Sequence, residues 1–279
     1  MRGFKTVLQG LLGIVLACCV AAATSTWLLS REGDLLFQWR GFRISACGLG
    51  AGISLLVTLL FANGWIAARK RRHPEGRSMA RLMNGLGFGL LPGAAVWKAF
   101  EQETFLGAGT PVPAGLPQAP WLTEQGICFP SRTEMLLALL LFAAACLWLF
   151  LRKNDLPENG DLMGVCAAIW AAGRTVTEGL RAGQTVLFEI PWAAGWAALA
   201  VMAIVLTGWT VRAFRQKKNT GYAYACIPVF AVTGTLLVLL QKGILLSYNA
   251  PAALAAETCC ALLAVKAVLC MGRVTRAEA

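Results

Sequence analysis

Residues 135–151 read MLLALLLFAAACLWLFL, an uninterrupted run without a charged side chain. A helix needs about 20 apolar residues to cross the hydrocarbon core of a bilayer, so a run of this kind predicts a membrane helix. The rest of the chain has the same character, because 57% of its 279 residues are hydrophobic, 14% are charged and the mean hydropathy is +0.62. Soluble domains contain about 25% charged residues. The composition therefore indicates an integral membrane protein.

The apolar residues fall into eight such runs, each near the length that a bilayer core requires. The runs are Val7–Leu29, Ile44–Ala68, Met79–Ala99, Met135–Leu151, Leu162–Leu180, Ile190–Val211, Tyr222–Leu240 and Pro251–Met271. Glycines and charges interrupt the third and the fifth, which are the weakest of the eight. We expect an all-α, polytopic membrane helix bundle of about eight transmembrane helices, with residues 1–279 in a single membrane domain.

The net charge of +11 is a signal of topology, because the basic residues gather in alternate loops. Cytoplasmic loops of membrane proteins are enriched in Lys and Arg, so this alternation places both termini in the cytoplasm. It also argues against a nucleic-acid partner. The loop residues concerned are Arg69, Lys70, Arg71, Arg72, Arg77 and Arg81, then Arg152 and Lys153, then Arg212, Arg215, Lys217 and Lys218, and finally Arg273 and Arg276.

The ten cysteines do not form a metal-binding pattern. Most of them lie in or at the ends of the expected membrane helices, where a small apolar side chain serves packing. No Cys-x-x-Cys motif occurs, and His73 is the only histidine. A structural zinc site needs four such ligands, so we expect no metal.

Three charged residues interrupt an otherwise apolar segment, AAIWAAGRTVTEGLR at 167–181. Arg174, Glu178 and Arg181 have the spacing i, i+4 and i+7, which places them on one face if the helix is continuous. Charges within a membrane segment are costly unless they meet water, a partner or a polar ligand. Two guanidiniums beside a carboxylate suit an anionic lipid headgroup, because arginine presents a planar fork of donors to phosphate. The alternative is an intramembrane ion pair between Arg174 and Glu178 that ties helices together.

Glycines are concentrated in the second and third runs, as ACGLGAGIS at 46–54 and NGLGFGLLPG at 84–93. Small residues let membrane helices approach closely, which is the favoured interpretation. The other interpretation is that the glycines, with Pro92, open the backbone around a bound headgroup.

Several of these segments resemble motifs of the bacterial phosphatidylglycerol–prolipoprotein diacylglyceryl transferase family. CFPSRTE at 128–134 leads into a membrane run as the family's HPSQLYE does, and WAAGRTVTEGLR at 170–181 resembles YGxxRxxxExxR. Between them, LWLFLRKNDLPENGDLMG resembles the family's basic, proline-containing turn. RISACGLGAG at 43–52 loosely resembles SFHGG, and LLPGAAVWKAFEQETFLG at 90–107 resembles GRxxNFxNxExxG. The resemblance covers residues 10–218 and is closest over 128–185, which leaves 219–279 as an appended two-helix hairpin.

The resemblance implies an activity, its partners and a location. Members of the family move diacylglyceryl from phosphatidylglycerol to the thiol of a lipobox cysteine on a secreted lipoprotein precursor, and they release glycerol phosphate. This implies a multi-pass protein of the bacterial cytoplasmic membrane, with its active face outward and without a cofactor. Arg174 matches the arginine of YGxxR and would hold the departing phosphate. Glu178 would orient an arginine, and Arg181 would steer the headgroup.

The sequence also departs from the family. The second arginine, within GRxxN, has no counterpart, so Lys98 is the candidate cation in its place, although a point charge does not reproduce a guanidinium fork. Glu103 stands in for the glutamate of that motif. The two family histidines fall on Cys47 and Cys128, which can be a disulfide, a reactive thiol or two unpaired small residues.

Two functions remain open at this point. The first is an active, divergent diacylglyceryl transferase in which Arg174, Glu178 and Glu103 act in catalysis, while Arg174, Arg181 and Lys98 bind the headgroup. The second is a non-catalytic relative that binds anionic lipid headgroups as an accessory membrane protein. Nothing positive favours an unrelated transporter or scaffold.

Overall fold

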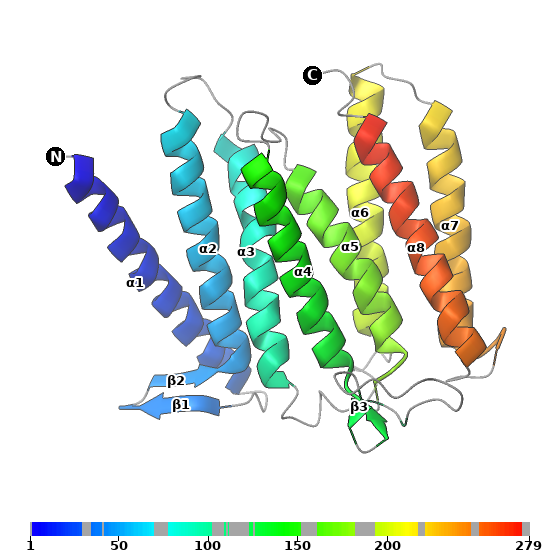
Figure 1. Ribbon diagram of the computed structural model, residues 1–279, viewed down its shortest axis with the longest axis horizontal. Helices are drawn as coiled ribbons and strands as arrows, with labels where there is room; N and C mark the ends of the chain where they lie inside the picture. Colours follow the sequence, from blue (N-terminus) through cyan, green and yellow to red (C-terminus); the bar gives the residue numbers. More distant parts are fainter. Residues whose placement is uncertain are drawn as a thin grey trace. The chain divides into compact units, whose positions relative to one another are not determined.

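The computed structural model describes residues 2–29, 35–40, 42–69, 78–101, 109, 111, 123–124, 126–151, 161–181, 193–216, 221–246 and 251–274. These residues form eight helices and two short antiparallel hairpins (Figure 1). The helices are α1 (Arg2–Leu29), α2 (Ala46–Arg69), α3 (Ser78–Glu101), α4 (Pro130–Leu151), α5 (Asp161–Glu178), α6 (Ala193–Arg215), α7 (Gly221–Gln241) and α8 (Pro251–Val274). The strands are β1 (Leu35–Trp39), β2 (Phe42–Ser45), β3 (Thr123–Glu124) and β4 (Ile127–Cys128).

Five of these helices are long and apolar enough to cross a membrane, as a helical membrane protein requires. The membrane-length segments are Ala46–Asn63, Pro130–Leu151, Gly195–Arg215, Tyr224–Gln241 and Pro251–Arg273. α1 contains a shorter apolar stretch, Leu11–Thr26. α3 and α5 correspond to the two runs that glycines and charges interrupt, and neither reaches this standard over the described residues. The count of eight spans and the placement of both termini therefore stay predictions.

The described chain separates into two compact units, Met1–Thr104 with Met135–Cys166, and Phe105–Glu134 with Ala167–Ala279. The first holds α1, α2, α3 and most of α4. The second holds most of α5 together with α6, α7 and α8. We call them unit 1 and unit 2. The expected single domain over residues 1–279 stays a prediction.

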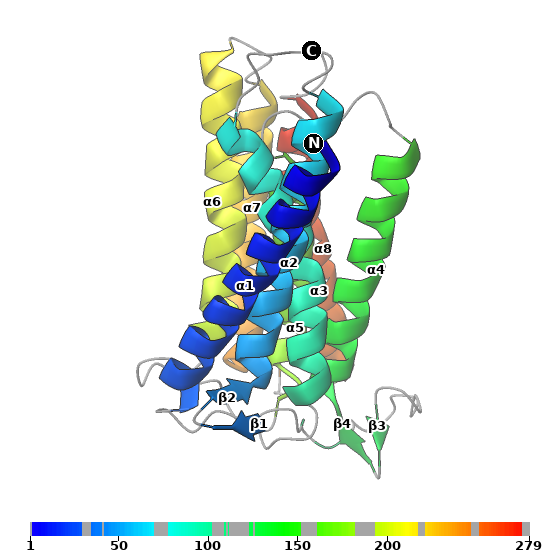
Figure 2. The same cartoon turned by 90° about the vertical axis from the view of Figure 1, so that its left-hand side faces the viewer.

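Unit 1 is built on close contact between glycine-rich helices, with α2 lying between α1 and α3 (Figures 1 and 2). A Cβ atom placed on Gly50 would lie 2.7 Å from the carbonyl oxygen of Gly93, and one on Gly52 would lie 3.0 Å from that of Ala17. These distances leave no room for a side chain. The glycines therefore serve close helix packing, as favoured from the sequence.

A second set of contacts in unit 1 joins α3, α4 and the start of α5. Leu91, Ala145, Leu162 and Cys166 form a buried apolar cluster. The ring of Phe88 packs against Phe142, with 4.8 Å between centroids. Asn84 Oδ1 accepts a hydrogen bond of 3.1 Å from the backbone N–H of Leu162. This bond satisfies a donor in the first turn of α5, where intrahelical acceptors are missing.

The hairpin β1–β2 joins α1 to α2 and was not predicted from the sequence. Its strands pair Phe37 with Ile44 and Trp39 with Phe42, and Arg40 in the turn has φ of 44°. A tight hairpin turn uses this left-handed conformation. The second expected membrane helix therefore begins at Ala46, two residues later than Ile44.

In unit 2, α7 and α8 form an antiparallel pair, and both contact α6. The most buried side chains of these three helices include Met202, Leu237, Val268 and Met271. Trp209 of α6 packs over Gly272 of α8, where a Cβ atom would lie 2.8 Å from the indole ring. α6, α7 and α8 thus share one apolar core in unit 2.

Candidate functional site

The polar centre of unit 2 begins at the first turns of α4. The expected helix over 135–151 starts earlier, at Pro130, because proline suits the first helical position, where its missing N–H would have no partner. The backbone N–H of Gly109 donates to the carbonyl oxygen of Cys128 over 2.8 Å, which holds the preceding hairpin β3–β4 in place. The extension brings Glu134 into the helix, where its side chain is 1% exposed.

Arg174 of α5 lies between two carboxylates. Its Nη1 donates a 2.5 Å hydrogen bond to Oε1 of Glu134, and its Nη2 lies 2.8 Å from Oε2 of Glu178. The pair with Glu178 is the i,i+4 ion pair that the sequence offered as the structural alternative. The pair with Glu134 joins α4 to α5.

Arg181 reaches the same carboxylate from outside the helix. α5 ends at Glu178, and a turn through Gly179 and Leu180 follows, so the expected helical face of three charges is wrong at its third member. The guanidinium nevertheless returns to the cluster. Arg181 Nη2 donates to both oxygens of Glu134 over 3.0 and 3.1 Å, and Nε lies 3.8 Å from Oε2 of Glu178.

The Arg–Glu cluster, as we call Glu134, Arg174, Glu178 and Arg181, is buried and charge-balanced. Each side chain is at most 9% exposed, and two guanidiniums face two carboxylates. Thr177 adds a hydrogen bond of 2.5 Å from its hydroxyl to Oε1 of Glu134. Buried charges are stable only when paired in this way.

Glu178 is the incomplete member of the Arg–Glu cluster. Its carboxylate lies close to both guanidiniums, but neither oxygen accepts a hydrogen bond with proper geometry from any described residue. Buried carboxylates in proteins are almost always hydrogen-bonded, because the unsatisfied acceptor costs about 1–3 kcal/mol or more. Among the described residues, the carboxylate of Glu178 is therefore held by its ion pairs with Arg174 and Arg181.

No family model, curated protein or solved structure matches this chain. The resemblance to the diacylglyceryl transferases therefore stays a prediction.

The C-terminal hairpin, which lies outside that resemblance, contributes two polar residues to the surroundings of the Arg–Glu cluster. Gln241 of α7 donates a 2.7 Å hydrogen bond from Nε2 to the carbonyl oxygen of Thr175. Glu257 of α8 is buried against Gly179, where a Cβ atom would lie 3.1 Å from its Oε2. α7 and α8 thus each place one polar side chain near the C-terminal end of α5. In the sequence, the sign of this contact is Glu257, a charged residue within an apolar run.

Two other expected site residues, Lys98 and Cys47, belong to unit 1. Lys98 is buried on α3, with its Nζ 5.2 Å from the centre of the Trp97 ring. Cys47 is half-buried in the first turn of α2. Glu103 lies outside the described residues.

Cys128 lies in unit 2, at the end of β4. It is a free cysteine, so the possible disulfide with Cys47 is not formed in the structure. Burial raises the pKa of its thiol above the ordinary value of 9.0. The thiol is therefore protonated near neutral pH and is a poor acceptor of a further proton. Among the residues described here, no three Cys, His, Asp or Glu side chains are grouped as metal ligands.

Proposed function

We propose that this protein is a divergent diacylglyceryl-transferase-like membrane protein that moves diacylglyceryl from phosphatidylglycerol to a lipobox cysteine thiol. The observation that carries the proposal is Glu134, which binds Arg174 and Arg181 at once. Glu134 ends the segment CFPSRTE, and the two arginines belong to WAAGRTVTEGLR. The two segments that most resemble the family therefore meet in one cluster of buried charge.

In this proposal the thiol sulfur of the acceptor bonds to the glyceryl carbon whose C–O bond to phosphate breaks, and glycerol phosphate leaves. Arg174 stabilises the negative charge that grows on the leaving phosphate, because a buried guanidinium is already oriented for it. The open acceptor positions of Glu178 receive the hydroxyls of the glycerol headgroup. Arg181 holds Glu134 so that this carboxylate does not compete for both nitrogens of Arg174.

The proposal includes a placement. We place the protein in a bacterial cytoplasmic membrane as eight spans with both termini inside, and the Arg–Glu cluster toward the outer leaflet. The alternation of basic loops supports this orientation. The partners are phosphatidylglycerol and secreted lipoprotein precursors.

A second candidate is a non-catalytic relative that binds an anionic headgroup without turnover. Two observations favour it. The four charges of the Arg–Glu cluster already balance, so a phosphate must displace a carboxylate from Arg174 or bring its own cation. Cys128, one of the two cysteines in the positions of the family histidines, keeps its proton near neutral pH and supplies no general base.

One assay separates the candidates. The purified full-length protein is incubated with phosphatidylglycerol and a lipobox peptide, and both the thioether product and glycerol phosphate are measured. Equilibrium binding of phosphatidylglycerol is measured in parallel against phosphatidylcholine. Product above the no-enzyme rate supports the transferase. Selective binding of phosphatidylglycerol without product supports the second candidate, and failure of both rejects the headgroup site.

Arg174→Lys tests the residue that both candidates need. A lysine keeps one positive charge but loses the second donor nitrogen, so we expect affinity for phosphatidylglycerol to fall about tenfold, which corresponds to about 1.4 kcal/mol. Arg273→Lys is the matched control, because Arg273 is exposed near the C-terminal end of α8. Equal affinity in the wild type and in both variants contradicts the role of Arg174.

A further inference from the structure

The two faces of the β1–β2 hairpin differ in chemistry. Side chains alternate along a strand, and paired residues share a face. Phe37 and Trp39 therefore lie on one face with Ile44, the partner of Phe37. Gln38 and its partner Arg43 lie on the opposite face. One face of the hairpin is therefore apolar and the other is polar.

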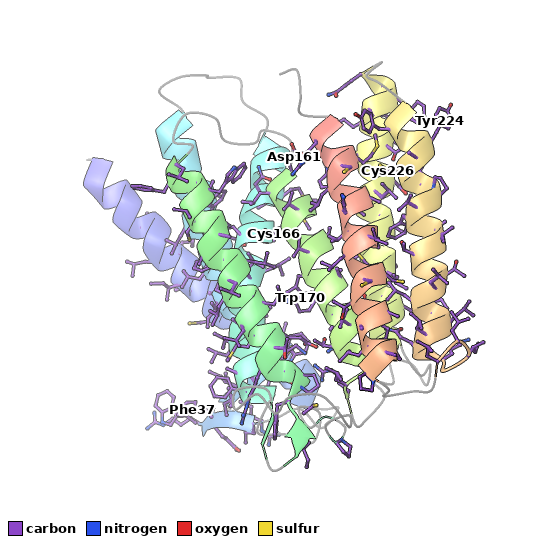
Figure 3. All side chains as sticks on the ribbon, turned by 45° about the vertical axis from the view of Figure 1, so that its right-hand side comes forward. Phe37, Asp161, Cys166, Trp170, Tyr224 and Cys226 are labelled. Atoms are coloured by element: carbon purple, nitrogen blue, oxygen red, sulfur yellow. The ribbon has the colours of Figure 1, made fainter. Side chains whose placement is uncertain are left out.

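Unit 1 does not cover the apolar face. Phe37 is 53% exposed and Trp39 is 59% exposed, and every residue of β1 is exposed. Figure 3 shows Phe37 on this hairpin, at the lower end of the helices of unit 1. A two-stranded hairpin is only marginally stable in water, and exposed aromatic surface of this kind marks a contact with a partner or a membrane.

The position of the hairpin in the chain identifies what covers this face. β2 ends at Ser45, and the membrane-length segment of α2 begins at the next residue, Ala46. The base of the hairpin is also tied to α1, because the backbone N–H of Ser45 donates to Ser25 Oγ over 3.0 Å. A segment with no spacer before a membrane helix lies at the level of the lipid headgroups.

The composition of the hairpin suits that level. Tryptophan concentrates at membrane interfaces, where its ring is apolar and its N–H remains hydrated. The guanidinium of Arg40 lies 5.3 Å from the centre of the Trp39 ring, and Arg43 is exposed on the polar face. Arginines in the headgroup region pair with lipid phosphates.

We propose that the β1–β2 hairpin is an interfacial anchor that lies in the plane of the bilayer. The face of Phe37 and Trp39 contacts the upper acyl chains, while Gln38 and Arg43 face headgroups and water. This inference does not depend on the transferase activity, because it rests on unit 1 alone.

Photo-crosslinking at adjacent positions tests the anchor. The full chain is reconstituted in nanodiscs of phosphatidylcholine and phosphatidylglycerol, with p-benzoylphenylalanine replacing Phe37, Trp39, Gln38 or Arg43, one position at a time. Each sample is irradiated, and covalent lipid adducts are quantified by mass spectrometry. We expect severalfold more lipid adduct at positions 37 and 39 than at 38 and 43. An aromatic probe in place of Phe37 or Trp39 keeps the size of the side chain, so these two variants retain the fold.

Two results overturn the proposal. Equal lipid labelling at all four positions means that the hairpin has no membrane-facing side. Crosslinks from positions 37 and 39 to a second copy or to peptides of the same chain, in place of lipid, mean that protein covers the face. Circular dichroism of each variant confirms that helix content is unchanged before the yields are compared.

Discussion

The glycine contact of α2 with α3 and the Arg–Glu cluster at the end of α5 bring helices together by opposite means. In unit 1 the side chains are missing, and the backbones touch because Gly50 and Gly93 have no Cβ atoms. In unit 2 the side chains are long and charged, and Glu134 holds Arg174 and Arg181 at hydrogen-bond distance. We therefore expect opposite changes to destabilise the two regions. Adding a Cβ atom destabilises the glycine contact, and removing a charge destabilises the Arg–Glu cluster.

The two regions also differ in their hydrogen bonding. Beside the glycine contact, Thr58 Oγ1 donates to the carbonyl oxygens of Ser54 and Gly85, so its hydrogen bonds stay within the two helices. In the Arg–Glu cluster two guanidiniums face two carboxylates, but neither oxygen of Glu178 accepts a hydrogen bond from a described residue.

The largest effect is expected for Glu134→Gln. Among the described residues this change leaves the buried guanidiniums of Arg174 and Arg181 with the carboxylate of Glu178, and breaking a buried ion pair on one side costs about 3–5 kcal/mol. The free energy of unfolding is measured by titrating detergent-solubilised protein with sodium dodecyl sulfate.

The double variant Glu134→Gln/Arg181→Gln is the control for charge balance. It removes one charge of each sign, so we expect it to be more stable than the sum of the two single variants predicts. Strict additivity of the two losses would show that charge pairing does not hold the Arg–Glu cluster together.

Gly50→Ala is expected to have the next largest effect. The new Cβ atom would lie 2.7 Å from the carbonyl oxygen of Gly93, a backbone atom that cannot rotate away. Overpacking of this kind costs about 1–3 kcal/mol, and we expect the upper part of that range. The same unfolding titration measures it.

Gly234→Ala provides the matched control on α7. A Cβ atom there meets nothing within 4 Å, so the variant should be neutral or more stable by about 0.5–1 kcal/mol, because alanine favours helix. Equal losses at Gly50 and Gly234 would contradict the close α2–α3 contact.

The sequence predicted the helices better than the site. Each of the eight expected apolar runs overlaps one helix. In a membrane, a long apolar segment satisfies the hydrogen bonds of its backbone by forming a helix. The favoured role of the glycines as packing residues is also confirmed by the Gly50–Gly93 contact. The hairpin β1–β2 was missed because Ile44 reads equally well as the start of the following apolar run.

The site could be predicted only in part, because its partners are distant in sequence. The Arg174–Glu178 pair follows from helical periodicity, but Glu134 is 40 residues away from Arg174 and was not singled out as a site residue. Its position at the head of an apolar run, within CFPSRTE, was the available signal. The sequence predicted that Arg181 lies on the same helix as Arg174, whereas that helix ends at Glu178. Gly179 is the one local sign of this end in the sequence.

The smallest expected effect is the loss of unfolding free energy on replacing Thr177 of α5, compared with Thr175. Both threonines are buried, and they lie two residues apart. The hydroxyl of Thr177 donates to Glu134 Oε1 over 2.5 Å, whereas that of Thr175 donates only to the carbonyl oxygen of Ala171 in its own helix. Valine has nearly the same shape as threonine, so Thr177→Val removes a hydrogen bond to a charged acceptor and should cost about 1.5 kcal/mol. Thr175→Val removes a back-bond that contributes little to helix stability and should change it by less than about 0.5 kcal/mol. If the two variants unfold at the same detergent concentration, the hydroxyl of Thr177 does not help to hold Glu134 in the Arg–Glu cluster.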